Sequence, residues 1–177
     1  HFALVGVICD RKGCFDVVKM AEKYHSQLSG KVMIHLAGNG EGERLQRDID
    51  RLGLSDVLSY EGWADAEKKA ALLNSADVYF LPSHNEGLPI SILEGMTYGL
   101  PVLSTPVGGI PSVVREGENG LLVPPADIDR MYQAIMTLAS DPSLRETMGA
   151  RSLEISRDYL VDNVKKELDA FYDRLLK

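Results

Sequence analysis

Short apolar runs alternate along this chain with longer segments in which apolar residues recur at helical spacing. The short runs predict strands at residues 3–8, 32–37, 57–60, 78–81, 102–104 and 121–123. The longer segments predict helices at residues 15–28, 43–52, 66–74, 89–98, 128–139, 142–155 and 161–175. Because nearly continuous apolar strands alternate with helices, we expect one α/β domain over residues 1–177, built on a single doubly wound, Rossmann-like parallel sheet.

The segments that follow the strands hold the more unusual residues. Doubly wound sheets bind ligands beyond the carboxyl ends of their strands, near the point where the strand order reverses. Lys12 and Gly13 follow the first strand, where a lysine can face a phosphate, although a solvated polar turn would have the same composition. The glycine-rich segment 38–42 lacks the G-x-G-x-x-G spacing of a dinucleotide site, so its glycines fit a turn equally well.

The loop after the fourth strand leads into the helix at 89–98 and carries Glu86 and Glu94, eight residues apart. At helical spacing, Ser91, Glu94 and Gly95 fall opposite the apolar side of this helix. That polar side has a single charge, whereas a solvated face usually has several, so we interpret it as the wall of a cleft. An amphipathic helix with a plain outer face is the alternative.

Two explanations fit the glutamate pair. The helix rises about 9 Å between Leu88 and Glu94, so we expect the two carboxylates to touch different parts of one extended ligand. We favour two hydroxyl-binding carboxylates over an acid/base pair, although the spacing alone leaves a glycosidase-like pair open. Trp63, the single tryptophan, can stack on a nucleobase or pack under its loop. His84 is interpreted as structural or solvated.

Composition narrows the class of protein. With 177 residues, 45% hydrophobic and 25% charged, the chain is expected to be globular. A net charge of −7 without a basic run argues against nucleic-acid binding. Cys9 and Cys14 lack the neighbours of a metal site, so we expect reduced cysteines and a cytoplasmic location. The apolar run directly after His1 leads us to expect a fragment of a longer protein.

A series of motifs runs through the chain in order: Lys12-Gly13, Gly38-x-Gly40, Glu61-Gly62, Ala76-Asp77-Val78, Pro82-Ser83, Glu86-Gly87-Leu88-Pro89, Glu94, Gly99-x-Pro101-Val102, Gly108-Gly109-Ile110-Pro111 and Asn119-Gly120-Leu121-Leu122-Val123. This series resembles the C-terminal, donor-binding half of retaining glycosyltransferases of family four, the glycosyl transferases group 1, which have the two-domain GT-B fold. The resemblance covers nearly the whole chain. Its most specific part is the glutamate pair within the Gly-Leu-Pro and Gly-x-Pro-Val frame.

The resemblance implies a domain that binds a nucleotide-diphosphate sugar without a metal cofactor. In the full protein, the sugar would pass to an acceptor such as a polysaccharide or a lipid-linked glycan, with retention of configuration. Glu86 would face the transferred sugar and Lys12 would pair with the diphosphate, as the catalytic residues. Backbone amides of Gly87 and Leu88 would meet the sugar or diphosphate, and Glu94 would bind the ribose hydroxyls. In our leading hypothesis, which goes beyond the resemblance, Trp63 in the loop after the third strand would hold the nucleoside together with Glu94.

Two departures from the family pattern affect these expectations. Family members usually have an arginine at the position of Val7, which shares the diphosphate with the lysine, so phosphate binding here is expected to be weaker, to use another group or to serve an unusual donor. Arg11 is nearby in sequence. The N-terminal acceptor domain is absent, so we expect the fragment alone to be inactive and any membrane contact to depend on that half. The alternatives are a nucleotide-sugar epimerase of the same fold and a non-catalytic nucleotide-sugar-binding subunit.

Overall fold

The fold is described by a computed structural model that covers residues 1–175, apart from the side chains of residues 167, 170 and 173. Its centre is a six-stranded sheet in the order β3-β2-β1-β4-β5-β6, with all neighbours parallel. The strands are β1 (Phe2–Val5), β2 (Ile34–Ala37), β3 (Leu58–Gly62), β4 (Val78–Leu81), β5 (Val102–Ser104) and β6 (Gly120–Leu122). The strand order reverses between β1 and β4, so the prediction of a doubly wound sheet is confirmed.

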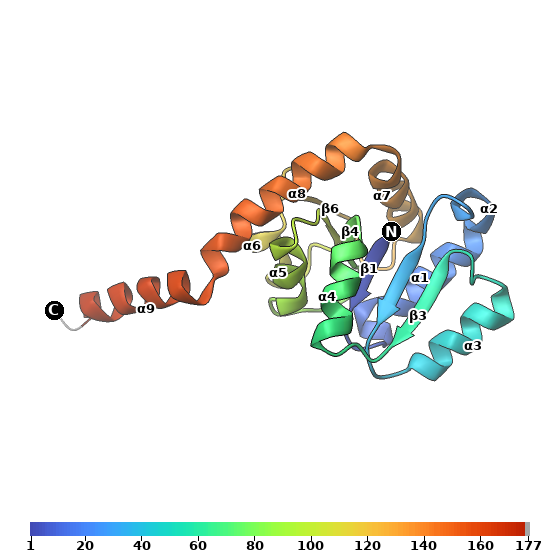
Figure 1. The fold of residues 1–177 in the computed structure, drawn as a ribbon, viewed down its shortest axis with the longest axis horizontal. Helices are drawn as coiled ribbons and strands as arrows, with labels where there is room; N and C mark the ends of the chain where they lie inside the picture. Colours follow the sequence, from blue (N-terminus) through green and yellow to red (C-terminus); the bar gives the residue numbers. More distant parts are fainter. Residues whose placement is uncertain (176–177) are drawn as a thin grey trace.

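Helices cover both faces of this sheet (Figure 1). One face carries α4 (Ala66–Ser75), α5 (Ile90–Thr97) and α8 (Pro142–Ser156), and the other carries α1 (Cys14–Lys23), α3 (Gly42–Leu52) and α7 (Ile128–Ser140). Shorter helices connect these elements: η1 (Asp10–Lys12), α2 (His25–Leu28), α6 (Ile110–Val113) and η2 (Arg157–Tyr159). The last helix, α9 (Val161–Leu175), projects away from the body of the domain (Figure 1). Within residues 1–175, no helix combines the length and apolar character needed to cross a bilayer.

The central strand β4 is buried along its whole length, as expected for a parallel strand covered on both faces. Its Tyr79 packs against Gly95 of α5, where a Cβ atom would lie 2.6 Å from the aromatic ring. Burial raises the pKa of the Tyr79 hydroxyl, which donates a hydrogen bond to the Val5 carbonyl at 3.2 Å. Gly95 therefore faces the core and lets α5 approach β4. Its predicted place on the polar cleft side was wrong.

Tertiary contacts explain the main differences from the predicted elements. The first strand ends at Val5 instead of residue 8, and beyond it Ile8 forms an isolated bridge with Gly40 in the loop after β2. The predicted helix 15–28 breaks at Tyr24, which stacks on Tyr132 of α7 with ring centroids 3.9 Å apart. The four-residue helix α6 was not predicted, since so short a segment shows no period.

Candidate functional site

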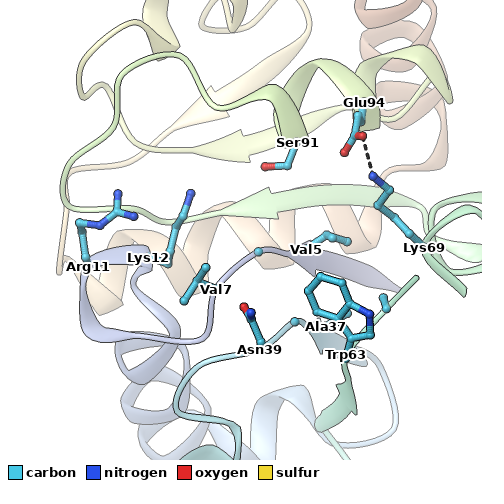
Figure 2. Close-up of a pocket in the computed structure, with 13 residues that line it drawn as sticks. Val5, Val7, Arg11, Lys12, Ala37, Asn39, Trp63, Lys69, Ser91 and Glu94 are labelled. Atoms are coloured by element: carbon cyan, nitrogen blue, oxygen red, sulfur yellow. Dashed lines mark hydrogen bonds and ion pairs between the residues drawn. The ribbon is translucent and has the colours of Figure 1, made fainter. Parts of the chain in front are cut away.

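A cavity of about 390 Å³ opens at the carboxyl ends of β1 and β2, beside the point where the strand order reverses. Its lining comes from the segments that follow β1, β2 and β3 and from one side each of α4 and α5 (Figure 2). Arg11 and Lys12 lie together at one end, while Trp63, Lys69 and Glu94 lie at the other (Figure 2). We call the first the cationic end and the second, after the part of the ligand that the sequence leads us to expect there, the nucleoside end.

Lys12 and Glu86 form a buried ion pair at the cationic end. Lys12 Nζ lies 2.6 Å from Glu86 Oε1, and the two side chains are only 11% and 7% exposed. The Ser83 hydroxyl donates to the same carboxylate oxygen at 2.7 Å. Arg11 lies 3.7 Å from the other oxygen, Oε2, and donates a hydrogen bond to the Asn85 carbonyl at 3.0 Å. One carboxylate thus faces two cations, which leaves a net positive charge for an anionic ligand.

Glycine geometry places Lys12 against this carboxylate. Lys12 ends η1, and the next residue, Gly13, has a φ of 75°, a left-handed conformation that glycine adopts readily. A Cβ atom on Gly13 would lie 2.1 Å from the Pro82 carbonyl oxygen at the end of β4. The absence of a side chain at Gly13 therefore lets the turn after β1 pack directly on the loop that carries Glu86.

The loop that carries Glu86 is held from the β5 side as well. Thr105 Oγ1 donates to the Ser83 carbonyl at 2.6 Å, and the Gly109 amide donates to the Gly87 carbonyl at 2.6 Å. A Cβ atom on Gly108, whose φ is 55°, would lie 1.8 Å from the Glu86 carbonyl oxygen. These contacts hold the Glu86 loop from the β5 side, as the close approach of Gly13 to Pro82 holds it from the β1 side.

His84 has a structural partner, in agreement with one of the two readings offered from sequence. Its Nε2 lies 2.5 Å from Oδ2 of Asp16 on α1, a side chain that is only 7% exposed. The His84 amide also donates to the Arg11 carbonyl at 2.8 Å. These bonds tie the Glu86 loop to the segment that carries both cations.

The nucleoside end is more open. Lys69 Nζ on α4 lies 2.6 Å from Glu94 Oε1 on α5, and the two side chains are 31% and 37% exposed. Trp63 is 67% exposed and forms part of the same lining (Figure 2). Lys69 was not predicted, because two adjacent lysines lie in the first turn of α4 and no spacing rule distinguishes them. Lys68 turns away from this cavity and donates to the Glu61 carbonyl.

The structure brings most of the predicted site residues together. Lys12, Trp63 and Glu94 line one cavity, and Glu86 joins it through its ion pair with Lys12. Ser91 lines the wall between the two ends, as expected for the polar side of its helix (Figure 2). Among the side chains that the structure describes, no group of three or more His, Cys, Asp and Glu is placed to hold a metal ion.

Two predicted positions lie outside the lining. Gly87 and Leu88 belong to the exposed loop just before α5. Within the described part of the chain, their amides donate no backbone hydrogen bond, so both N–H groups are free for a ligand.

Val7 lines the cavity and is 45% exposed, while Arg11 supplies the second cation. The structure thus shows Arg11 turned toward the site, which the sequence left open.

The sequence of this chain is similar to those of known proteins. The family model described as "Glycosyl transferases group 1" matches residues 2–154. A 2-deoxystreptamine N-acetyl-D-glucosaminyltransferase from Streptomyces fradiae is 29% identical over 170 residues, which are 94% of this chain and 40% of that protein. The chain spans less than half the length of the curated relatives it matches.

Solved structures give the same architecture. Sucrose-phosphate synthase from Thermosynechococcus elongatus superposes with a TM-score of 0.85 at 25% identity, covering 99% of this chain and 45% of that one. The C-terminal domain of a glycosyl transferase group 1 family protein from Francisella tularensis superposes with a TM-score of 0.79 at 20% identity. That match covers 91% of this chain and 87% of the solved domain. The fold is therefore that of one Rossmann-like half of a GT-B protein.

Proposed function

This chain belongs to the glycosyl transferases group 1 family, and from that premise we propose that it is the donor-binding domain of a retaining glycosyltransferase. The observation that carries the proposal is the two-ended cavity. Arg11 and Lys12 at one end suit the diphosphate of a nucleotide sugar, and Glu94 with Trp63 at the other suits a nucleoside. The acceptor, a sugar chain or a lipid-linked glycan, would reach the donor from the remainder of the longer protein.

The charges of the cavity match such a ligand. Three cations, Arg11, Lys12 and Lys69, face two carboxylates, Glu86 and Glu94, so the formal sum is 3 − 2 = +1. A nucleoside diphosphate is an anion, and its phosphate oxygens would bind Lys12 and Arg11 in addition to the Glu86 carboxylate. Because Lys12 has three N–H donors, it can keep Glu86 and still bind a phosphate oxygen.

When the sugar is transferred, the largest increase in negative charge would occur on the diphosphate, at the cationic end. The bond between the anomeric carbon and the diphosphate oxygen breaks, and its electron pair leaves with the diphosphate. Lys12, Arg11 and the free amides of Gly87 and Leu88 would stabilise that charge. The acceptor oxygen would form the new bond to the anomeric carbon and pass its proton to the departing diphosphate oxygen, while Glu86 would orient the sugar. As the family resemblance implies, we expect these groups to stabilise the leaving diphosphate without a bound metal.

Arg11 can supply the positive charge that is missing at Val7, where family members usually have an arginine. We propose that Arg11 serves as the second phosphate ligand in place of the arginine that family members usually have at position 7. Its guanidinium lies in the cavity lining beside Lys12, which supports this role. The alternative of a non-catalytic nucleotide-sugar-binding subunit depended mainly on Val7, so the position of Arg11 makes it less favoured. An epimerase is not favoured either, because the relatives reported above are transferases.

Calorimetric titration of the full-length protein with UDP, GDP and ADP tests the proposal. We expect one of these nucleotides to bind, and Glu94→Ala to weaken that binding at least tenfold. If none binds, or if Glu94→Ala leaves the affinity unchanged, the assignment is wrong. We also expect residues 1–177 alone to transfer no sugar to an added acceptor. Measurable transfer by these residues would contradict the need for a second domain.

A further inference from the structure

The ion pair between Lys69 and Glu94 joins two walls of the cavity that belong to different helices. Lys69 lies on α4, which contacts β1, and Glu94 lies on α5, which contacts β4 and β5. Their charged atoms meet at 2.6 Å in the lining of the nucleoside end (Figure 2). Neither residue is needed to cover the apolar core, because both side chains are about one-third exposed, at 31% and 37%. The contact therefore suggests a role at the site itself.

Glu94 has a fixed backbone but a side chain that needs a partner. Gly95 and Met96 anchor its helix against the core, and Gly95 packs directly on Tyr79. The glutamate side chain itself has several rotatable bonds. Among the residues that the structure describes, Lys69 is the one that bonds this carboxylate, through Oε1, and Oε2 accepts no hydrogen bond. Lys69 thus sets the direction of the carboxylate and leaves one oxygen free toward the cavity.

We propose that Lys69 is a positioning residue for the nucleotide. It holds the Glu94 carboxylate so that the free oxygen accepts a hydrogen bond from a ribose hydroxyl. It also offsets the negative charge of Glu94 in a cavity that takes an anionic ligand. This inference rests on the proposed function, since it assigns a specificity determinant within that site. Lys69 recognises the ribose through the carboxylate that it orients.

Lys68 offers a matched control on the same helix. It has the same charge, neighbours Lys69 in sequence and bonds the Glu61 carbonyl instead of Glu94. It lines a different cavity, together with His35 and Glu61. Lys68→Gln therefore changes the net charge of the protein as Lys69→Gln does, but leaves the Glu94 carboxylate in place.

The experiment measures how each lysine changes the preference for a ribose hydroxyl. ADP, GDP and UDP are titrated into the full-length protein, and the nucleotide that binds is compared with its 2′-deoxy and 3′-deoxy forms. In the wild type, we expect removal of the contacted hydroxyl to weaken binding about tenfold. In Lys69→Gln, we expect the parent nucleotide to bind about tenfold more weakly and the deoxy penalty to fall to about twofold. Lys69→Arg should keep the penalty, and Lys68→Gln should behave as the wild type.

Equal weakening of the parent and deoxy nucleotides in Lys69→Gln would overturn the inference, because it would mean that the lysine acts through its charge alone. An unchanged affinity would overturn it too. Because the pair is partly exposed, Lys69→Gln should fold normally, and Lys69→Arg supplies a second variant that keeps the charge. Failure of all three nucleotides to bind the wild type would remove the proposed function and this inference together, whereas the other two results remove this inference alone.

Discussion

The two ends of the cavity are built in opposite ways. At the cationic end, Lys12 and Glu86 are 11% and 7% exposed, and Ser83 and a second cation share the same carboxylate. At the nucleoside end, the charged side chains are about one-third exposed, at 31% and 37%, and Trp63 is 67% exposed. The buried end is fixed by the fold, whereas the open end is fixed mainly by one ion pair.

This difference separates binding from stability. A buried charge that loses its partner cannot be solvated by water, so a change at the cationic end should affect folding as well as ligand binding. An exposed charge that loses its partner is solvated, so a change at the nucleoside end should affect binding almost alone. Substitutions at Lys12 and at Lys69 therefore report on different properties, even though both residues line one cavity.

The largest expected effect is on stability at the cationic end. Lys12→Met leaves the buried Glu86 carboxylate with only the exposed Arg11, 3.7 Å from Oε2, as a neighbouring cation. We therefore expect the free energy of unfolding to fall by about 3 kcal/mol, the lower limit for a broken buried ion pair. The exposed counterpart, Lys69→Met, should change it by less than about 0.5 kcal/mol. The urea dependence of hydrogen exchange in β1 and β4 of the full-length protein reports on unfolding of this sheet.

The double variant Lys12→Met/Glu86→Leu is the control for this prediction. It removes both buried charges, so most of the lost stability should return, although nucleotide binding should not. Equal effects of Lys12→Met and Lys69→Met on stability would contradict the contrast between the two ends.

The second prediction concerns the backbone that holds Glu86. Gly108→Ala forces a side chain into a left-handed position and against the Glu86 carbonyl oxygen, so the loop must shift. We expect the free energy of unfolding to fall by about 2 kcal/mol and nucleotide binding to weaken at least tenfold. Gly87→Ala is a matched control for stability, because a Cβ atom there meets nothing within 4 Å. A stable Gly108→Ala variant with normal binding would show that the loop is not held from the β5 side.

The third prediction uses a buried thiol close to the cationic end. Burial raises the pKa of Cys14 from 9.0 to about 11. An unfolded chain ionises this thiol above pH 9, whereas the folded domain keeps it neutral, so its contribution to stability is lost as the pH rises from about 9 to 11. At pH 10.5 we expect this loss to be about 2 kcal/mol.

Cys14→Ala isolates that contribution from the other groups that titrate at high pH. Unfolding free energies of wild type and variant are compared at pH 8 and at pH 10.5. The wild type should lose about 2 kcal/mol more than the variant over this interval. Parallel losses in the two proteins would mean that water reaches Cys14 in the folded domain.

The sequence was sufficient for the parts of the fold that depend on local pattern. Alternating apolar runs and helical segments gave the doubly wound sheet, and strand ends identified the edge at which Lys12, Trp63 and Glu94 meet. The limits of β1 and the break at Tyr24 depend on tertiary contacts, with the loop after β2 and with α7, that no single segment contains.

The contacts between side chains of the site could not be predicted from the sequence, for the same reason. Sequence spacing could not show that Arg11 lies 3.7 Å from Glu86, since the two are 86 − 11 = 75 positions apart with several elements between them. Nor could it distinguish Lys69 from Lys68, because adjacent helical residues point in different directions that only packing can assign. The motif series identified which residues to consider, and the topology determined which of them touch.

The smallest expected effect lies at the most exposed residue of the site. Trp63→Ala should weaken nucleotide binding about fivefold, near the lower limit for stacking of an aromatic ring on a base, because so much of the indole faces solvent. Trp63→Phe should keep most of the affinity, and neither variant should change the free energy of unfolding by more than about 0.5 kcal/mol. Calorimetry measures the affinity and hydrogen exchange in β1 measures the stability. Unchanged affinity in Trp63→Ala would mean that the indole does not touch the base, and the nucleoside would then depend on Glu94 and Lys69 alone.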